Sequence, residues 1–154
     1  MSDRKRLVVA LVAAVIPWSA TTAVAAGATP EVPIQFFSPL LARRPANIVL
    51  ATITPPALAG TGTFKRPGSI KWKTWTPTSA TGVGAEFLDP CRPSCAEDDY
   101  AKFPVTIRFS DPGRLAGHLV FRRLSLAFTG RRPPKGTPTR LTVGVRDDKF
   151  EYQP

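Results

Sequence analysis

Short runs of β-branched and aromatic residues, separated by turn residues, recur along the chain after residue 46. The clearest run is 103–110, where Val105, Ile107 and Phe109 alternate with polar or charged residues. Such alternation places successive side chains on opposite faces of a β-strand. No segment shows the i, i+3, i+4, i+7 apolar spacing of an amphipathic helix, and 17 prolines interrupt any long helical pattern. The pattern therefore predicts an all-β domain.

Six segments are predicted to be strands: 47–54, 69–76, 80–88, 103–110, 117–129 and 139–146. Turn residues at 55–62, at 111–113 and in a basic, proline-rich loop at 130–138 separate them. About six strands at this spacing predict a small antiparallel β-sandwich or barrel.

The phase of the alternation predicts where some side chains point. In 69–76, Ile70 and Trp72 share one face, whereas Lys71, Lys73 and Trp75 share the other. The phase slips once, at Arg122-Arg123, which predicts a bulge or a bend between two sheets.

The chain begins with the three parts of a cleavable secretory signal peptide. Arg4 to Arg6 are basic, Leu7 to Ile16 are apolar, and Ala23-Val24-Ala25 has the small-x-small pattern that a signal peptidase recognises. The apolar run is shorter than the roughly 20 residues that a membrane-spanning helix needs. We therefore expect residues 1–25 to be removed and the protein to be secreted, either freely or in association with the cell wall.

Cleavage leaves a proline-rich lead-in, 26–46, and a single domain, 47–154. The lead-in contains enough apolar residues for part of it to pack on the domain, and we expect it to cover Trp75. In an exported chain, the two cysteines, Cys91 and Cys95, are expected to form a disulfide bond that fixes a local turn.

Basic residues concentrate in the C-terminal 50 residues, and the whole chain carries a net charge of +10. Adjacent strands would gather them into a cationic surface for an anionic envelope polymer or a lipid surface; the alternative is a solvated basic exterior. The export signal argues against a specific nucleic-acid partner. The candidate anion-binding residues are Lys71, Lys73, Arg108, Arg122, Arg123, Arg131, Arg132, Arg140 and Arg146.

No catalytic or cofactor motif is present. His118 is the only histidine, and no nucleophile elbow, zinc-protease motif or phosphate-binding loop occurs. The acidic step Glu97-Asp98-Asp99 lacks the alternating spacing of a calcium loop, so we interpret it as a solvated turn rather than a cation site. We expect no cofactor, no metal and no enzymatic activity.

Four elements in order carry a resemblance: Trp72-x-x-Trp75, Ala80-Thr81-Gly82-x-Gly84, Cys91-x-Pro93-x-Cys95-Ala96, and Pro104-Val105 at the start of a strand. Together they resemble a group of small actinobacterial secreted proteins of unknown function, over roughly residues 44–130. The resemblance implies a self-contained exported β-domain whose cysteines pair, and it implies no activity. Glu97 departs from the group, where a small residue is usual.

Three hypotheses follow from the sequence. The first is an exported, non-enzymatic β-domain that binds anionic envelope components through its basic face. The second is an interaction or inhibitor-like module that binds another exported protein through the Cys91–Cys95 loop. The third is a small hydrolase that would need His118 beside a carboxylate.

Overall fold

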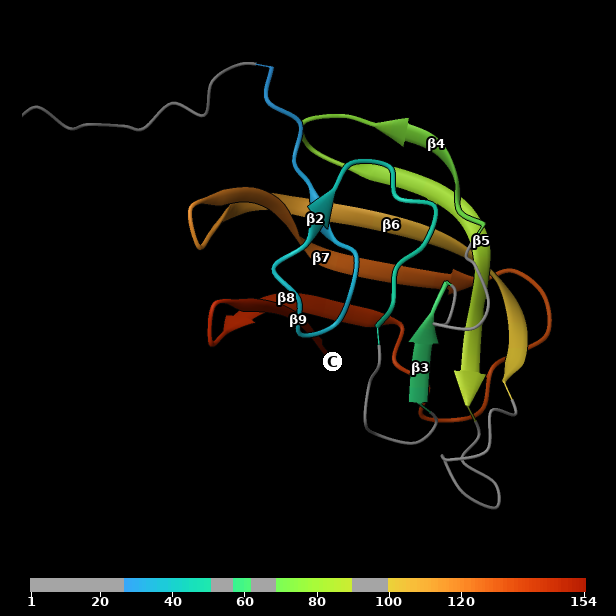
Figure 1. Ribbon diagram of the computed structural model, residues 1–154. Coiled ribbons are helices and arrows are strands. Elements are labelled where there is room, and N and C mark those ends of the chain that lie inside the picture. The colour runs from blue at the N-terminus through green and yellow to red at the C-terminus, as the bar shows by residue number, and fades with distance from the viewer. Residues whose placement is uncertain (1–26, 51–56, 62–68, 90–99) are drawn as a thin grey trace, which may run out of the picture.

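The computed structural model describes residues 27–50, 57–61, 69–89 and 100–154. These residues form nine strands and no helix, so the all-β prediction is confirmed (Figure 1). No helix in these ranges is long and apolar enough to cross a membrane. The predicted signal peptide, the cysteines Cys91 and Cys95 and the acidic step 97–99 lie outside the described residues.

Seven strands form one antiparallel sheet in the order β3-β5-β6-β7-β8-β9, with β4 also paired to β5. The strands of this sheet are β3 (Ala57–Gly60), β4 (Lys71–Trp75), β5 (Ala80–Asp89), β6 (Ala101–Leu115), β7 (His118–Phe128), β8 (Arg140–Arg146) and β9 (Lys149–Gln153). Two short strands, β1 (Val32–Pro33) and β2 (Leu41–Ala42), pair separately. Within the described residues no ladder joins β9 back to β3, so the main sheet is open and is not a closed barrel.

The alternating pattern of 103–110 produces the predicted inward row. Val105, Ile107 and Phe109 are at most 2 % exposed and pack in the core. Their partners across the ladders continue the row, because directly opposed residues of antiparallel strands share a face. Phe109, for example, pairs with Ala80 on β5 and with Leu124 on β7, and both are buried.

The predicted turn at Asp111-Pro112-Gly113 is wrong, because β6 continues through these residues to Leu115. The reversal instead occurs at Ala116-Gly117, where both residues have positive φ, 46° and 80°. Two successive positive φ angles are typical of the tight turns that join twisted antiparallel strands.

The alternation changes phase at Arg122, but the predicted bulge or bend between two sheets is wrong, because β7 stays in one sheet and keeps one register with β6. Ser110 pairs with Arg123, and Pro112 pairs with Phe121. Between these pairs lie Asp111, which has φ 59°, and Arg122. Val120 and Phe121 are both fully buried, so the alternation changes phase here without a change in register.

The structure contains two strands that the sequence pattern does not predict, β3 and β9. Residues 55–62 were predicted to be a turn, but Ala57–Gly60 is the edge strand β3. The strand at 139–146 was predicted to be the last, but the chain turns at Asp147 and Asp148 and returns as β9. In the predicted strand 47–54, the described residues 47–50 form no ladder, and Val49 makes single bridges to Gln35 and Gly60.

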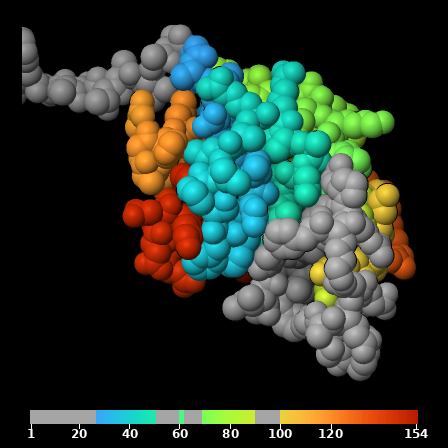
Figure 2. Space-filling view, viewed as in Figure 1, coloured from blue at the N-terminus to red at the C-terminus, as the bar shows by residue number. Residues whose placement is uncertain are grey.

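The lead-in and the adjoining residues 47–50 lie across one face of the main sheet and together form the second layer of the fold (Figures 1 and 2). Val32, Ile48 and Leu50 insert into the core and are at most 1 % exposed. Tyr152 on β9 donates a buried hydrogen bond of 2.7 Å to the carbonyl of Pro33. Burial raises the pKa of this tyrosine well above its usual value, so the hydroxyl remains a donor.

Both edges of the open sheet are protected by this layer. On the β9 edge, Phe37 N–H donates to the carbonyl of Phe150, and Phe150 N–H donates to the carbonyl of Ser38. On the β3 edge, Thr61 N–H donates to the carbonyl of Ile48. Unpaired strand edges promote association with other chains, and these hydrogen bonds occupy part of each edge.

The predicted faces of β4 are partly wrong, because the strand has a bulge between Trp72 and Thr74. Because of it, Trp75 pairs with the buried Ala80 and lies on the inward face with Trp72, not on the outward face with the lysines. The predicted cover over Trp75 is confirmed, since its indole Nε1 donates to the carbonyl of Pro30 at 3.0 Å.

Candidate anion-binding face

The face of the sheet opposite the lead-in carries two rows of polar side chains. Directly paired residues place Thr81, Arg108, Ser125 and Arg140 in one row across β5 to β8. The next row contains Ser110, Arg123, Thr142 and Gln153, across β6 to β9. Arginines and hydroxyl side chains therefore alternate across three neighbouring strands, β6, β7 and β8.

Arg108, Arg123 and Arg140 form the cationic part of this arrangement, which we call the arginine face. Arg123 lies diagonally next to both other arginines, at the roughly 7–8 Å that separates diagonal neighbours in antiparallel sheets. Arg108 and Arg140 are two strand spacings apart, or about 10 Å. All three side chains are exposed.

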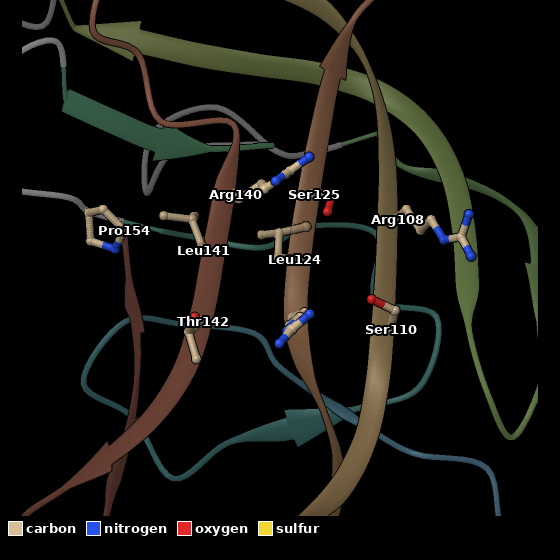
Figure 3. Close-up of a pocket in the computed structure, with 9 residues that line it drawn as sticks. Arg108, Ser110, Leu124, Ser125, Arg140, Leu141, Thr142 and Pro154 are labelled. Carbon is tan, nitrogen blue, oxygen red and sulfur yellow. The ribbon is translucent and has the colours of Figure 1, made fainter.

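A shallow hollow of about 670 Å³ lies over these residues (Figure 3). It is lined by Arg108, Ser110, Arg123, Leu124, Ser125, Arg140, Leu141, Thr142 and Pro154. None of the lining side chains is acidic, and the α-carboxylate of the last residue, Pro154, forms no ion pair with the arginines among the described residues. The hollow therefore combines three positive charges with three hydroxyl groups that donate hydrogen bonds.

Two of the three arginines have no counter-charge among the described residues. In the part of the chain that the structure describes, the side chains of Arg108 and Arg140 make no hydrogen bond and no ion pair. Arg123 has one distant partner, with 3.7 Å between its Nε and Asp111 Oδ2. The arginine face is therefore available to an external anion.

Arg122 was predicted to belong with Arg123, but the structure gives it a different environment. Its Nη2 donates to Asp111 Oδ1 at 2.8 Å. The side chain folds back over Gly113, where an added Cβ would lie 2.6 Å from Arg122 Nε. Arg122 thus stabilises the phase change between β6 and β7 and does not line the hollow.

The other candidate arginines lie apart from the hollow. Arg131 lies over the ring of Phe103, with 4.5 Å from its Cζ to the ring centroid. Arg146 lies 4.6 Å from the centroid of the Phe37 ring and pairs with Glu151 at 3.8 Å. Arg132 is exposed in the loop between β7 and β8.

Lys71 and Lys73 are exposed on β4. Lys71 pairs with Val83, which pairs with Thr106 on β6, so these three residues share a face. Thr106 is two positions from Arg108 on the same strand. Lys71 therefore belongs to the same face as the arginines, whereas Lys73 lies in the β4 bulge.

His118 is exposed at the start of β7, and its ring centroid is 6.1 Å from that of Phe150. Among the described residues, no aspartate or glutamate forms an ion pair with it. The hydrolase hypothesis requires a carboxylate beside His118, and the described residues provide no ion pair of this kind. The described residues also contain no group of three or more histidine, cysteine, aspartate or glutamate side chains that could hold a metal ion.

Glu86 is a buried acid that the sequence did not single out. It pairs with Phe103 and so faces the core, with its side chain fully buried. Its Oε1 accepts a hydrogen bond of 2.8 Å from Gly60 N–H, while Oε2 has no hydrogen-bond partner within the described part of the chain. Desolvation raises the pKa of this carboxyl to about 8, although the Gly60 hydrogen bond opposes the shift.

The hydroxyl side chains of the hollow, Ser110, Ser125 and Thr142, were not predicted as site residues. The alternation of each strand gives their outward direction, but their position beside the arginines depends on the register between strands.

Comparisons with protein-family models, with curated proteins and with solved structures find no match to this chain.

Proposed function

We propose that this protein is exported and that it binds an anionic component of the cell envelope through the arginine face, without catalysing a reaction. The signal-peptide pattern of residues 1–25 supports export. The observation that carries the binding proposal is the hollow over Arg108, Arg123 and Arg140, which contains no acidic side chain. Arginine suits this role because its planar guanidinium donates hydrogen bonds in pairs to phosphate, sulfate or carboxylate groups.

The charges of this face serve binding better than stability. Three neighbouring positive charges on one surface repel one another, and two of them gain no compensating ion pair among the described residues. Some arginines outside this face do have a counter-charge, for example Arg122 with Asp111 and Arg146 with Glu151. An external polyanion would supply the missing counter-charge.

The proposal is tested by salt-gradient elution from an immobilised sulfated polysaccharide. The purified protein is compared with the triple variant Arg108→Gln/Arg123→Gln/Arg140→Gln. A matched triple variant, Arg44→Gln/Lys135→Gln/Lys149→Gln, removes three exposed positive charges that lie outside the hollow.

We expect the arginine-face variant to elute at much lower salt than the matched variant. If all three arginines contact the polymer, the slope of log affinity against log salt falls by about 2, because each lost contact removes roughly 0.7. Equal shifts in the two variants would mean that only net charge matters, and the proposed site would be wrong.

A further inference from the structure

We propose that the ligand of the arginine face is a linear polymer of phosphate groups that lies across the strands, from Lys71 on β4 to Arg140 on β8. This inference rests on the proposed function and adds the chemical class and the direction of the ligand. It uses four basic residues that the ladders place on one face: Lys71, Arg108, Arg123 and Arg140.

The length of this basic track favours a polymer. From β4 to β8 the sheet has four strand spacings, so the track measures about 19 Å across the strands. The charges follow one another along it as Lys71, Arg108, Arg123 and Arg140, one on every strand except β5. A single compact anion cannot reach charges at both ends of such a track.

The directions of the side chains lead to the same conclusion. Arg140 extends from β8 towards β7 and Ser125, whereas the guanidinium of Arg108 extends in the direction of β5 (Figure 3). The two side chains do not converge on one point, as the donors of a site for one small ion would. They spread the positive charge along the track.

The hydroxyl groups favour phosphate over carboxylate. One guanidinium fork satisfies both oxygens of a carboxylate, whereas a phosphate group retains further acceptor oxygens after the fork has bound. Ser125 lies directly between Arg108 and Arg140, and Ser110 and Thr142 lie on either side of Arg123. Each arginine thus has a hydroxyl donor on a neighbouring strand.

The same face lacks the apolar side chains that a lipid surface would bind. Two large apolar residues among those described are exposed, Leu40 and Val145. Leu40 belongs to the lead-in on the opposite side of the sheet, and Val145 pairs with the core residue Phe150, so it faces the same way as the lead-in. Electrostatic contact with a polymer fits the arginine face better than insertion into a bilayer.

The experiment compares four probes by titration calorimetry at several salt concentrations: inorganic phosphate, tripolyphosphate, long-chain polyphosphate and a polyglutamate of matched charge number. The proteins are the wild type, Lys71→Gln, Arg140→Gln and the control Lys149→Gln. Tripolyphosphate is too short to span the track, whereas long-chain polyphosphate spans it.

We expect saturable binding of long-chain polyphosphate, weaker binding of polyglutamate and no saturable binding of inorganic phosphate. Lys71→Gln should lower the salt slope for the long chain by about 0.7 and leave tripolyphosphate unchanged. Arg140→Gln should weaken both phosphate polymers, and Lys149→Gln neither.

Two results would overturn this inference while leaving the proposed function intact. Equal effects of Lys71→Gln and Lys149→Gln on the long chain would mean a compact site without a track. Polyglutamate binding as tightly as polyphosphate would remove the preference for phosphate. If no polyanion bound in a salt-dependent way, the proposed function itself would fail.

Discussion

The indole rings of Trp72 and Trp75 meet edge to face, with 4.7 Å between their centroids and 84° between their planes. Each ring also donates a hydrogen bond to the lead-in, Trp72 to the carbonyl of Pro45 at 2.8 Å and Trp75 to that of Pro30. The pair therefore attaches the second layer to the sheet at two points. Regular alternation would place these two residues on opposite faces, and the β4 bulge is what brings the rings together.

This attachment predicts the effect of removing one indole donor. Trp75→Phe keeps an aromatic ring near Phe121 but leaves the Pro30 carbonyl without its donor, and an unsatisfied buried carbonyl costs about 1–3 kcal/mol. We expect a loss of this size in urea unfolding, with faster hydrogen exchange at Phe121 N–H, which bonds to Glu31. Wild-type stability in the variant would show that the indole hydrogen bond contributes nothing.

The close contacts around Gly60 can be tested with a matched pair of glycine variants. Its φ is +111°, and an added Cβ would lie 2.0 Å from the carbonyl oxygen of Ile48. Gly136 also has a positive φ, +90°, but a Cβ there meets nothing within 4 Å. Gly60→Ala should therefore cost on the order of 3 kcal/mol or more, or prevent folding, whereas Gly136→Ala should cost about 1 kcal/mol from backbone strain alone. Similar unfolding midpoints for the two variants would contradict the close approach of residues 48–50 to β3.

Glu86 predicts a specific pH dependence of stability. Its pKa is raised from 4.5 to about 8 in the folded protein, so between these values the folded state keeps a proton that the unfolded state has lost. The contribution is fully present below pH 4.5 and is lost as the pH rises towards 8. The free energy of unfolding should fall within this window by on the order of 1.4 kcal/mol per pH unit.

The control is Glu86→Gln, which retains an acceptor for Gly60 N–H and cannot ionise. Urea unfolding of both proteins between pH 4 and 9 should show a much flatter profile for the variant. An unchanged slope would mean that another group causes the dependence.

The substitution Asp111→Asn should strengthen binding to the sulfated polysaccharide and lower the stability of the fold. Asp111→Asn removes the negative charge beside Arg122 and Arg123, so more positive charge faces the hollow. The stability should fall by less than about 1 kcal/mol, because these ion pairs are partly exposed. Elution from the sulfated polysaccharide should move to higher salt. Asp148→Asn makes the same change in net charge at the β8–β9 turn and should have a smaller effect on elution. Lower-salt elution of Asp111→Asn would contradict the arginine face.

The turn between β8 and β9 predicts a stabilising substitution. Asp147 and Asp148 both have positive φ, 49° and 57°, a conformation that Asn-Gly adopts with less strain. Asp147→Asn/Asp148→Gly should raise stability by about 0.5–1 kcal/mol, measured as a higher urea midpoint. A lower midpoint would mean that the aspartates make contacts that offset their strain.

The sequence predicted the bounds of the strands that turn residues flank on both sides. The bounds of β5, β7 and β8 agree with the predicted segments to within one residue at each end. Asp111-Pro112-Gly113 has the composition of a turn, yet it lies within β6, because the pairing of Pro112 with Phe121 and Gly113 with Val120 outweighs local preference. Asp147-Asp148 lacks the glycine that normally marks a tight hairpin, so β9 was missed.

The candidate site could be predicted from the sequence only in part, because alternation gives the direction of a side chain but not its neighbours on other strands. Outward positions of Arg108 and Arg123 follow from alternation within single strands. Their position beside Arg140, and the separation of Arg122 from them, depend on register and on the phase change at Asp111, which are long-range properties. Glu86 could not be predicted as buried, because its surroundings include Gly60, 26 residues earlier in the chain.

The hydrogen bonds of the lead-in to β9 have a consequence for the order of folding. Tyr152 bonds to Pro33 across 119 positions, and Ser38 pairs with Phe150, so residues near the start of the described chain depend on residues near its end. Contacts between such distant residues form late and slow the folding of the whole chain. A nascent chain lacking β9 cannot complete its second layer. Completion of the second layer therefore waits for the strand that is last in order among those described, and the two layers finish their packing together.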